Sequence, residues 1–489
     1  GVGTYGQFEI DYTYEENQKF TRGDIISESI EDQIKGAKEG AVVAIPAGEY
    51  TTLPNPANKI TIVCQPGTVF TGTSSLNIKG STVIGATFEN EDDVAVSGTI
   101  YGTFKNCEFI GAEALRWCYS EQGKPVVFED CVIKTDFRGF HFDDMKGDVT
   151  FKNCEIAGFN AYGGQGTIKF EGCTFTNDES SYNGLNIYAN TIVEDCSFEF
   201  VSGKTNFIDM EGTDKTLTIE NSSATLDGKL ANIADFVGGS KLGENILIID
   251  GNYYVKTATS FLKVCTDVLS DASKNVNVVL GDNIDLAGIE WPAVKTAAAF
   301  VLDGKGYSIK NLTTTAVESH GFYSTAMFTS TRKAATIKNL VVENATVTGN
   351  GGDNSHGAVL VACNYAALNI EGVTVKESTV ENCDRSSVIT TYLYFTNATV
   401  KNCLVEGCTV NSIGTAGALL GMNNGHNFEA TGNTVNNTTI SSSEGGNKAG
   451  ILIGTWQNAG TLTSEGNTHS GSKAINAGVE TNNEIGRHA

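Results

Sequence analysis

One pattern of apolar and polar residues recurs five times in the first half of the chain. Each copy contains an apolar residue, a charged residue, a turn-forming residue, a cysteine, a mostly polar position and a second apolar residue. The copies occupy residues 104–109, 128–133, 151–156, 170–175 and 193–198. Alternation on both sides of a turn residue predicts two short strands that meet at a corner, with the charged side chains directed outward.

The residue before each cysteine is of a type that accepts a left-handed backbone conformation, as a sharp corner requires. These residues are Asn106, Asp130, Asn153, Gly172 and Asp195, so the steps between them are 24, 23, 19 and 23 residues. Related corners at Gly85 and Asn221 are followed by Ala86 and Ser222 in place of cysteine. Such a period is typical of one coil of a three-sided parallel β-helix, in which like residues of successive coils form ladders about 4.8 Å apart.

The second half repeats with a longer period. Its turn residues are Asn311, Asn339, Gly372, Asn402, Gly432 and Gly466, at steps of 28, 33, 30, 30 and 34 residues. Most of these turns follow a small residue and an apolar run, within residues 326–328, 357–361, 386–389, 417–421 and 450–454. The sequence therefore predicts larger coils built on the same plan.

Each solenoid needs a cap, because the open end of a β-helix exposes strand edges and an apolar cross-section. An amphipathic pattern over residues 24–38 predicts the first capping helix, with Gly40 ending it, and a second apolar stripe predicts another helix near residues 259–272. The expected fold is all-β. It is a right-handed parallel β-helix in two tandem segments, residues 1–254 and 255–489, each opened by a short helix.

The segment after the first predicted helix, residues 41–50, reads Ala-Val-Val-Ala-Ile-Pro-Ala-Gly-Glu-Tyr. A helix followed by this strand resembles the opening of the pectin lyase-like β-helix superfamily, and the coils to residue 254 are similar to that family. In the second half, residues 300–312 and the Gly-Ala-Leu-Leu-Gly and Gly-Ile-Leu-Ile-Gly segments at 417–421 and 450–454 resemble bacterial surface proteins with GLUG-type repeats. That resemblance implies a surface location.

Composition narrows the classes of function. The formal net charge is −24, so the summed field repels nucleic acids and polyanions within a Debye length of about 8 Å. No apolar run approaches the roughly 18 residues that span a bilayer. We expect a secreted or cell-surface protein from which a signal or lipid-anchor segment has been removed, with no nucleic-acid partner.

The twelve cysteines would ordinarily indicate disulfides in an exported protein. Five of them share one slot of the repeat that Ala86 and Ser222 fill elsewhere, which favours a role as small buried apolar residues. Cys403 and Cys408 are the pair for which a disulfide is least excluded. Zinc is not expected, because no Cys-x-x-Cys pair occurs.

The candidate chemistry lies in the segment Arg138-Gly139-Phe140-His141-Phe142-Asp143-Asp144. Resemblance to pectin lyase-like enzymes implies carboxylates with a nearby Arg, Lys or His, so Arg138, His141, Asp143 and Asp144 are the catalytic candidates. Asp143 and Asp144 are also candidates for calcium, the one cofactor that the sequence allows. The alternative is a solvated loop, and the segment lacks the further motifs that polygalacturonases carry.

Four further histidines, His320, His356, His426 and His469, are isolated in the sequence and are expected to be loop residues rather than ligands.

Three functions remain open. The favoured one is a non-catalytic, adhesin-like surface protein that binds a polysaccharide or cell-surface glycan, preferably a neutral one because the chain is acidic. The second is a polysaccharide lyase or glycoside hydrolase acting in a groove of the first solenoid. The third is a structural stalk without a ligand.

Overall fold

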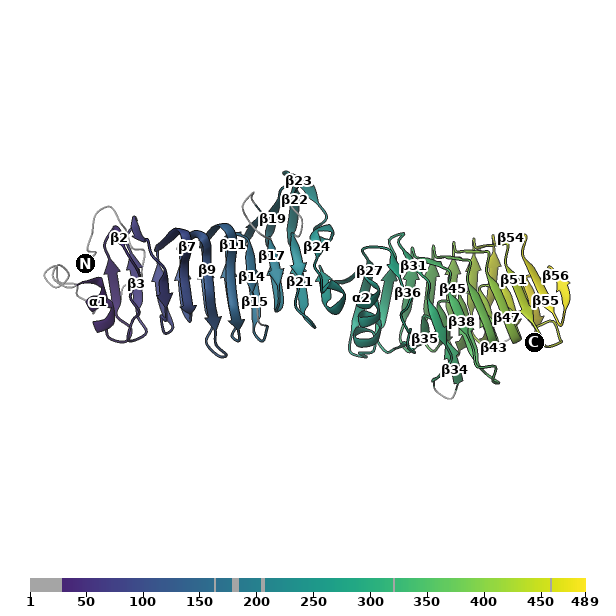
Figure 1. Cartoon of the computed structure of the whole chain (residues 1–489). Helices are drawn as coiled ribbons and strands as arrows, with labels where there is room; N and C mark the ends of the chain where they lie inside the picture. The colour runs from purple at the N-terminus through teal and green to yellow at the C-terminus, as the bar shows by residue number, and fades with distance from the viewer. Residues whose placement is uncertain (1–28, 162–163, 178–183, 204–206, 320–321, 458–459) are drawn as a thin grey trace. The chain divides into compact units, whose positions relative to one another are not determined.

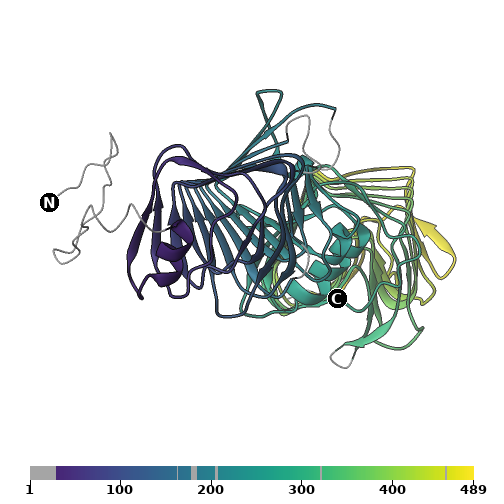
Figure 2. The same ribbon diagram turned by 60° about the vertical axis from the view of Figure 1, so that its left-hand side comes forward.

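The computed structural model describes residues 29–161, 164–177, 184–203, 207–319, 322–457 and 460–489. The chain divides into two compact units, Gly1–Asp250 and Gly251–Ala489. Both are built from short parallel strands stacked coil upon coil (Figures 1 and 2), which confirms the all-β parallel β-helix. In the parts of the chain described, no helix has the length and apolar character needed to cross a membrane.

The first unit has two main runs of parallel strands. One run contains β1 (Val42–Ile45), β3 (Thr61–Cys64), β6 (Ser81–Ile84), β8 (Gly102–Lys105), β10 (Val126–Glu129), β12 (Val149–Lys152), β15 (Thr167–Glu171), β18 (Asn190–Glu194), β21 (Thr216–Glu220) and β25 (Ile246–Ile249). The other contains β2 (Gly48–Tyr50), β4 (Thr68–Phe70), β7 (Thr87–Thr99), β9 (Glu108–Ser120), β11 (Val132–Met145), β13 (Glu155–Ala157), β16 (Thr174–Thr176), β19 (Ser197–Phe200) and β22 (Ser223–Leu226), with β23 (Lys229–Ala231) antiparallel to β22.

A branch of the second run leaves β11 at its carboxyl end. It contains β14 (Phe159–Ala161), β17 (Leu185–Ile187), β20 (Ile208–Met210) and β24 (Val237–Gly238), while β5 (Ser74–Leu76) pairs with β7. This branch carries the polar residues that are described below.

The second unit has four runs of strands. The first contains β26 (Asn252–Val255), β27 (Asn275–Leu280), β30 (Ala299–Asp303), β36 (Ala335–Lys338), β41 (Leu368–Glu371), β45 (Ala398–Lys401), β49 (Phe428–Thr431) and β53 (Leu462–Glu465). The second contains β28 (Ile284–Asp285), β31 (Ser308–Lys310), β37 (Val341–Glu343), β42 (Thr374–Lys376), β46 (Leu404–Glu406), β50 (Thr434–Asn436) and β54 (Thr468–Ser470).

The third run contains β29 (Lys295–Thr296), β35 (Phe328–Thr331), β40 (Val361–Asn364), β44 (Thr390–Tyr394), β48 (Leu420–Asn424), β52 (Ile453–Trp456) and β57 (Ile485–His488). The fourth contains β32 (Thr313–Thr315), β33 (Val317–Ser319), β34 (Phe322–Thr325), β38 (Thr346–Thr348), β39 (His356–Ala358), β43 (Thr379–Ser387), β47 (Thr409–Gly417), β51 (Thr439–Ser442), β55 (Lys473–Asn476) and β56 (Val479–Thr481).

The predicted corners are confirmed. Asn106, Asp130, Asn153, Asp195 and Asn221 have φ between 50° and 53°, and Gly172 has φ 65°. In the second unit the corner residues Asn311, Asn339, Gly372, Asn402, Gly432 and Gly466 also have positive φ. The periodic Asn, Asp and Gly residues of the sequence therefore mark the coils.

Ladders of like side chains fill the core. Phe104, Phe128, Phe151 and Phe170 are buried, and successive rings stack with centroids 5.2, 4.8 and 5.0 Å apart. Each buried ring contributes roughly 1.5–3 kcal/mol relative to an exposed one. Stacking at the coil repeat explains why phenylalanine recurs at this position of the template.

The cysteines form a second ladder beside the corners, and all twelve are free and buried, Cys403 and Cys408 included. The backbone N–H of Cys173 donates to Sγ of Cys196 at 3.3 Å, and that of Cys196 donates to Oγ of Ser222 at 3.0 Å. The thiol of Cys196 and the hydroxyl of Ser222 thus both accept a backbone hydrogen bond at this position of the repeat. Cys403 and Cys408 do not form a disulfide.

The first capping helix is shorter than predicted. Helix α1 covers Ile30–Gly36, and the side chain of Ser29 caps it by accepting from the N–H of Asp32 at 3.1 Å. Residues 24–28 of the predicted helix lie outside the described residues. The helix ends before residue 38 because Ala37 is extended, and Gly40, with φ 77°, shapes the turn before β1.

The second helix, α2 (Ala258–Lys263), continues as a π-helical turn through Val264–Val268. Thr257 and Ser260 form a capping box at its start, and Phe261 stacks on Trp291 with ring centroids 5.3 Å apart. This helix lies within the range expected from its apolar stripe.

The glycines of the segments 417–421 and 450–454 have a steric role. A β-carbon on Gly417 would lie 2.2 Å from the carbonyl oxygen of Leu420, and one on Gly454 would lie 2.6 Å from that of Gly421. The motif is thus explained by the close approach of backbones, and it carries no functional assignment by itself.

Candidate functional site

The sequence-predicted residues Arg138, His141, Asp143 and Asp144 all lie in β11. The side chains of the first three lie outside the described residues. Asp144 pairs in register with Tyr119 of β9, and its carboxylate forms an ion pair with Nζ of Lys146 at 2.8 Å. Throughout the described portion of the chain, no group of three or more His, Cys, Asp or Glu side chains is placed to hold a metal ion.

Strand pairing extends this segment into a row of polar positions. His141 pairs with Asn160, Asn160 with Asn186, and Asn186 with Asp209. The side chains of Asn186 and Asp209 are buried, with 5 % and 3 % exposure. Burial, with a smaller contribution from Glu211, raises the pKa of Asp209 to about 6. We name these four positions the polar row.

A bulge beside β11 exposes an aromatic side chain in the same unit. Trp117 of β9 has φ 52° and is 47 % exposed, and the guanidinium of Arg116 lies 4.7 Å from its ring centroid. Arg116 also forms an ion pair with Glu113, which pairs in register with Arg138. Bulges of this kind redirect side chains and are frequent near functional sites.

The second unit carries a more extensive aromatic surface on its third run of strands. Thr331 pairs with Asn364 and Asn364 with Leu393, so the residues that follow them, Arg332, Tyr365 and Tyr394, are neighbours on successive coils. The guanidinium of Arg332 lies 3.9 Å from the ring centroid of Tyr365, and the rings of Tyr365 and Tyr394 are 5.2 Å apart.

Phe395 completes this surface. Its ring packs edge-on against Tyr394 at 4.7 Å and lies 5.9 Å from the ring of His426. Phe395 is 60 % exposed and has φ 50°, a conformation that costs a bulky residue about 1–2 kcal/mol. We name Tyr365, Tyr394 and Phe395 the aromatic row.

A buried polar cluster lies beside the aromatic row. The ring of Tyr392 lies 6.1 Å from that of Tyr394 and 4.9 Å from that of His356. The guanidinium of Arg385 lies 4.9 Å from the centroid of Tyr392 and donates to Oδ1 of Asn354 at 2.8 Å. These contacts fix the orientation of Tyr392 and Arg385.

His356 accepts a hydrogen bond in this cluster. Its Nε2 lies 3.0 Å from Nη1 of Arg385, and arginine has only donors, so the imidazole nitrogen accepts. Burial, and secondarily the charge of Arg385, lowers the pKa of His356 to about 3. His356 is therefore neutral across the physiological range.

The prediction that the isolated histidines are loop residues is wrong for His356 and His469. His356 lies in β39 and is fully buried, and His469 lies in β54. His426 is in a bend between β48 and β49, as expected, whereas His320 lies outside the described residues. His356 is buried in β39, whose three residues are all buried, and its isolated sequence position does not reveal this.

Sequence reasoning also missed the aromatic row, although a signal for it exists. Arg332 and Tyr365 each precede the next predicted turn residue by seven positions (339 − 332 and 372 − 365), and Tyr394 precedes Asn402 by eight. Counting seven positions backward from each turn residue aligns Arg332 and Tyr365 with Phe395, the neighbour of Tyr394. Asn186 and Asp209 were missed because the loops before them differ in length.

Comparisons with known proteins assign no family. No protein-family model matches the chain, and no curated protein does. A solved structure from Bacteroides ovatus, provisionally named an immunoglobulin A1 protease, has a TM-score of 0.36 and 15 % identity over 49 % of this chain and 84 % of its own. The catalytic domain of a GH87 α-1,3-glucanase with nigerose has a TM-score of 0.17 and 11 % identity over 79 % and 64 %. Similarities this low carry no functional argument.

Proposed function

We propose that this protein binds a polysaccharide or cell-surface glycan on the aromatic row of its second unit, without catalysis there. The observation that carries the proposal is the exposed, strained Phe395, which packs edge-on against Tyr394, itself a neighbour of Tyr365. Exposed aromatic side chains on a rigid sheet offer flat apolar faces, and the C–H faces of sugar rings pack on such surfaces.

The spacing of the row supports an extended chain as the ligand. Successive coils place Tyr365 and Tyr394 with ring centroids 5.2 Å apart. This distance is comparable to the separation of successive sugar rings in an extended polysaccharide. A repeating ligand would therefore meet one ring on each of these two coils.

Polar groups continue the row along the same sheet. Tyr394 pairs in register with Asn424 on the next coil, and both are at least partly exposed. An amide offers donors and an acceptor to sugar hydroxyls. Aromatic faces flanked by a few polar groups are the usual composition of small-molecule and sugar sites.

The strain at Phe395 supports a functional role rather than a packing role. A side chain with 60 % exposure gains little from burial, so packing does not offset the cost of its left-handed backbone. Residues held in such conformations are concentrated at binding and catalytic sites.

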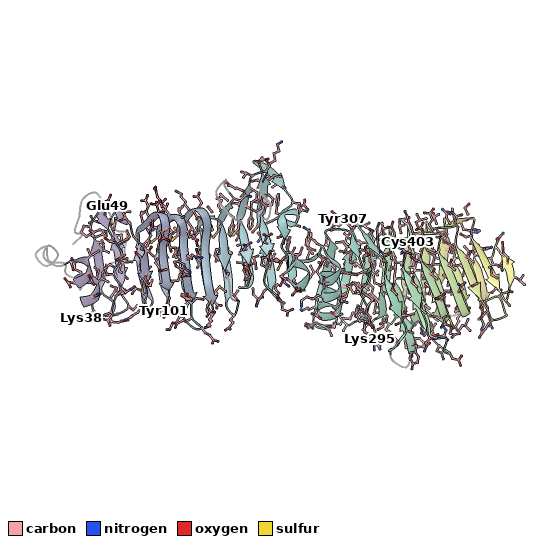
Figure 3. All side chains as sticks on the ribbon, in the orientation of Figure 1. Lys38, Glu49, Tyr101, Lys295, Tyr307 and Cys403 are labelled. Atoms are coloured by element: carbon pink, nitrogen blue, oxygen red, sulfur yellow. The ribbon has the colours of Figure 1, made fainter. Side chains whose placement is uncertain are left out.

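The experiment compares binding to a panel of neutral and acidic polysaccharides by affinity electrophoresis and calorimetry. Tyr394→Ala combined with Phe395→Ala should weaken binding at least tenfold, about 1.4 kcal/mol. The matched control is Tyr307→Ala, because Tyr307 is 36 % exposed and lies on the side of this unit opposite to Lys295 of β29 (Figure 3). Absence of binding to every polymer, or equal losses in both variants, would overturn the proposal.

A secreted or cell-surface location forms part of this proposal, in line with the resemblance to surface proteins with GLUG-type repeats. Protease accessibility on intact cells of the producing organism is the direct measurement. An adhesin-like role predicts that the protein is cleaved from outside the cell. Recovery only from the cytosol would refute this part.

A second candidate function is a polysaccharide lyase or hydrolase activity at the polar row of the first unit. The observation that favours it is the buried Asp209, with a pKa near 6, on the row that includes His141. Carboxyl groups with raised pKa values serve as general acids. Release of reducing ends or unsaturated products, abolished by Asp209→Asn, would support it, whereas unchanged release in that variant would exclude Asp209.

A further inference from the structure

The aromatic row begins at a cationic end, which is unusual in a chain with a net charge of −24. Arg332 occupies the coil before Tyr365, and Lys333 follows it in the chain. On the preceding coil, Lys295 pairs in register with Ser330. Solvent-exposed charges more than about 8 Å from this site are largely screened by salt. The electrostatic potential at the start of the row is therefore set mainly by Arg332, Lys333 and Lys295.

Arg332 differs from three surface lysines of this unit. Lys310, Lys338 and Lys401 form ion pairs with carboxylates, each with a partner on an adjacent coil. Arg332 is exposed and forms no ion pair with a carboxylate of any described residue. Its guanidinium instead lies over the ring of Tyr365 at 3.9 Å.

The contact with Tyr365 holds the guanidinium beside the ring, and Arg332 remains exposed. Arginine presents paired N–H donors in a rigid fork that matches the two oxygens of a carboxylate or sulfate. No carboxylate side chain occupies the row at Arg332, Tyr365, Tyr394 or Asn424. An anionic substituent on a sugar bound to Tyr365 would therefore meet a donor pair and no opposing charge.

We propose that the glycan bound on the aromatic row carries an anionic group, a carboxylate or a sulfate, which Arg332 binds at the start of the row. This inference rests on the proposed glycan-binding function and names its ligand class. The expectation of a neutral polymer follows from the net charge of the whole chain. The anionic group is inferred instead from the charged residues beside the aromatic row. Uronic or sialic acids and sulfated sugars share the required chemistry.

The experiment uses matched pairs of polymers and the full chain. Polygalacturonate is compared with its carboxyl-reduced neutral form, and chondroitin sulfate with its desulfated form, so that the two pairs separate the carboxylate from the sulfate. Calorimetry should give at least tenfold tighter binding for one acidic member than for its neutral counterpart. That preference should fall as the salt concentration rises.

Three variants test the role of Arg332. Arg332→Gln should lose about tenfold in affinity for the acidic polymer and change the neutral affinity by less than twofold. Arg332→Lys should recover part of the lost affinity for the acidic polymer, because lysine keeps the positive charge but lacks the planar pair of N–H donors. Lys310→Gln, which removes the same charge from β31 of the second run of strands, should leave both affinities unchanged.

The outcomes separate this inference from the proposed function. Equal affinities for the acidic and neutral members of both pairs would overturn the anionic ligand while leaving glycan binding intact. No binding to any polymer by the unmodified protein would overturn the glycan-binding function itself. An equal loss in Lys310→Gln, or a loss of neutral binding in Arg332→Gln, would also overturn the role of Arg332, provided that thermal melts confirm folding.

Discussion

Nη1 of Arg385 lies 3.0 Å from Nε2 of His356, in the cluster around Tyr392. A permanently charged donor thus meets a histidine that burial keeps neutral, with a pKa of about 3. This pair connects the stability of the second unit to pH and contacts the ring of Tyr392, which lies beside Tyr394.

Acidification should destabilise the second unit through His356. Its pKa is lowered from 6.5 in the folded state, so the neutral ring contributes stability that is complete above pH 6.5 and is lost as pH falls toward 3. The fall in pKa from 6.5 to about 3 corresponds to a loss on the order of 5 kcal/mol. His356→Gln keeps an acceptor and should flatten the decline of the urea midpoint between pH 7.5 and 4. An unchanged decline would contradict this assignment.

In the first unit, a rise in pH rather than a fall should lower stability through Asp209. Its pKa is raised from 3.8 to about 6, so its contribution to stability is complete below pH 4 and is lost as pH rises through 6. Asp209→Asn should therefore raise the urea midpoint at pH 7.5 and increase the free energy of unfolding by about 3 kcal/mol. Glu211→Gln should give a smaller gain, because Glu211 is the lesser cause. A destabilised Asp209→Asn variant would show that the carboxylate is stabilised in the fold.

Replacing Phe395 with asparagine should increase the stability of the second unit and weaken glycan binding. Asparagine tolerates a left-handed backbone, so Phe395→Asn should relieve about 1 kcal/mol of strain and raise the thermal midpoint. The same variant should weaken glycan binding, because the exposed ring is removed. Calorimetric melts and binding titrations measure both effects. A variant that loses stability would mean that contacts with Tyr394 and His426 outweigh the strain.

The twelve thiols should be unreactive in the native protein. All are buried, and burial raises the pKa of Cys64 and Cys363 to about 12, so little thiolate exists at neutral pH. A chromogenic disulfide reagent should detect no thiols before denaturation and twelve in guanidinium chloride without reductant. Fewer than twelve after denaturation would reveal a disulfide.

The left-handed corners should tolerate only certain residues. Asn153 has φ 50°, and Gly172 fills the equivalent corner on the next coil. Asn153→Gly should therefore cost less than about 1 kcal/mol, whereas Asn153→Val should cost more than 1–2 kcal/mol. Urea midpoints followed by circular dichroism provide the comparison. Equal effects of the two substitutions would indicate that the side chain, which donates from Nδ2 to Oδ1 of Asp130 at 3.3 Å, matters more than the backbone.

The repeat could be read from the sequence because its signals are local. A corner residue such as Asn153 must accept positive φ whatever surrounds it, and Phe151 and Cys154 keep fixed offsets from it. The polar and aromatic rows are non-local. Asn186 meets Asp209, and Tyr365 meets Tyr394, only through loops whose lengths vary from coil to coil.

The sequence by itself therefore determined the architecture: the solenoid, its corners, its buried cysteine ladder and its two capping helices, because each depends on backbone preference and alternation within a few residues. Only the tertiary structure decided which side chains share a surface. The stacking of coils brought Arg332, Tyr365 and Tyr394 together and buried His356 beside Arg385. Phe395 joins this surface through its contact with Tyr394. The sequence does not reveal these contacts, because the loop lengths that set the register between coils do not recur with a fixed period.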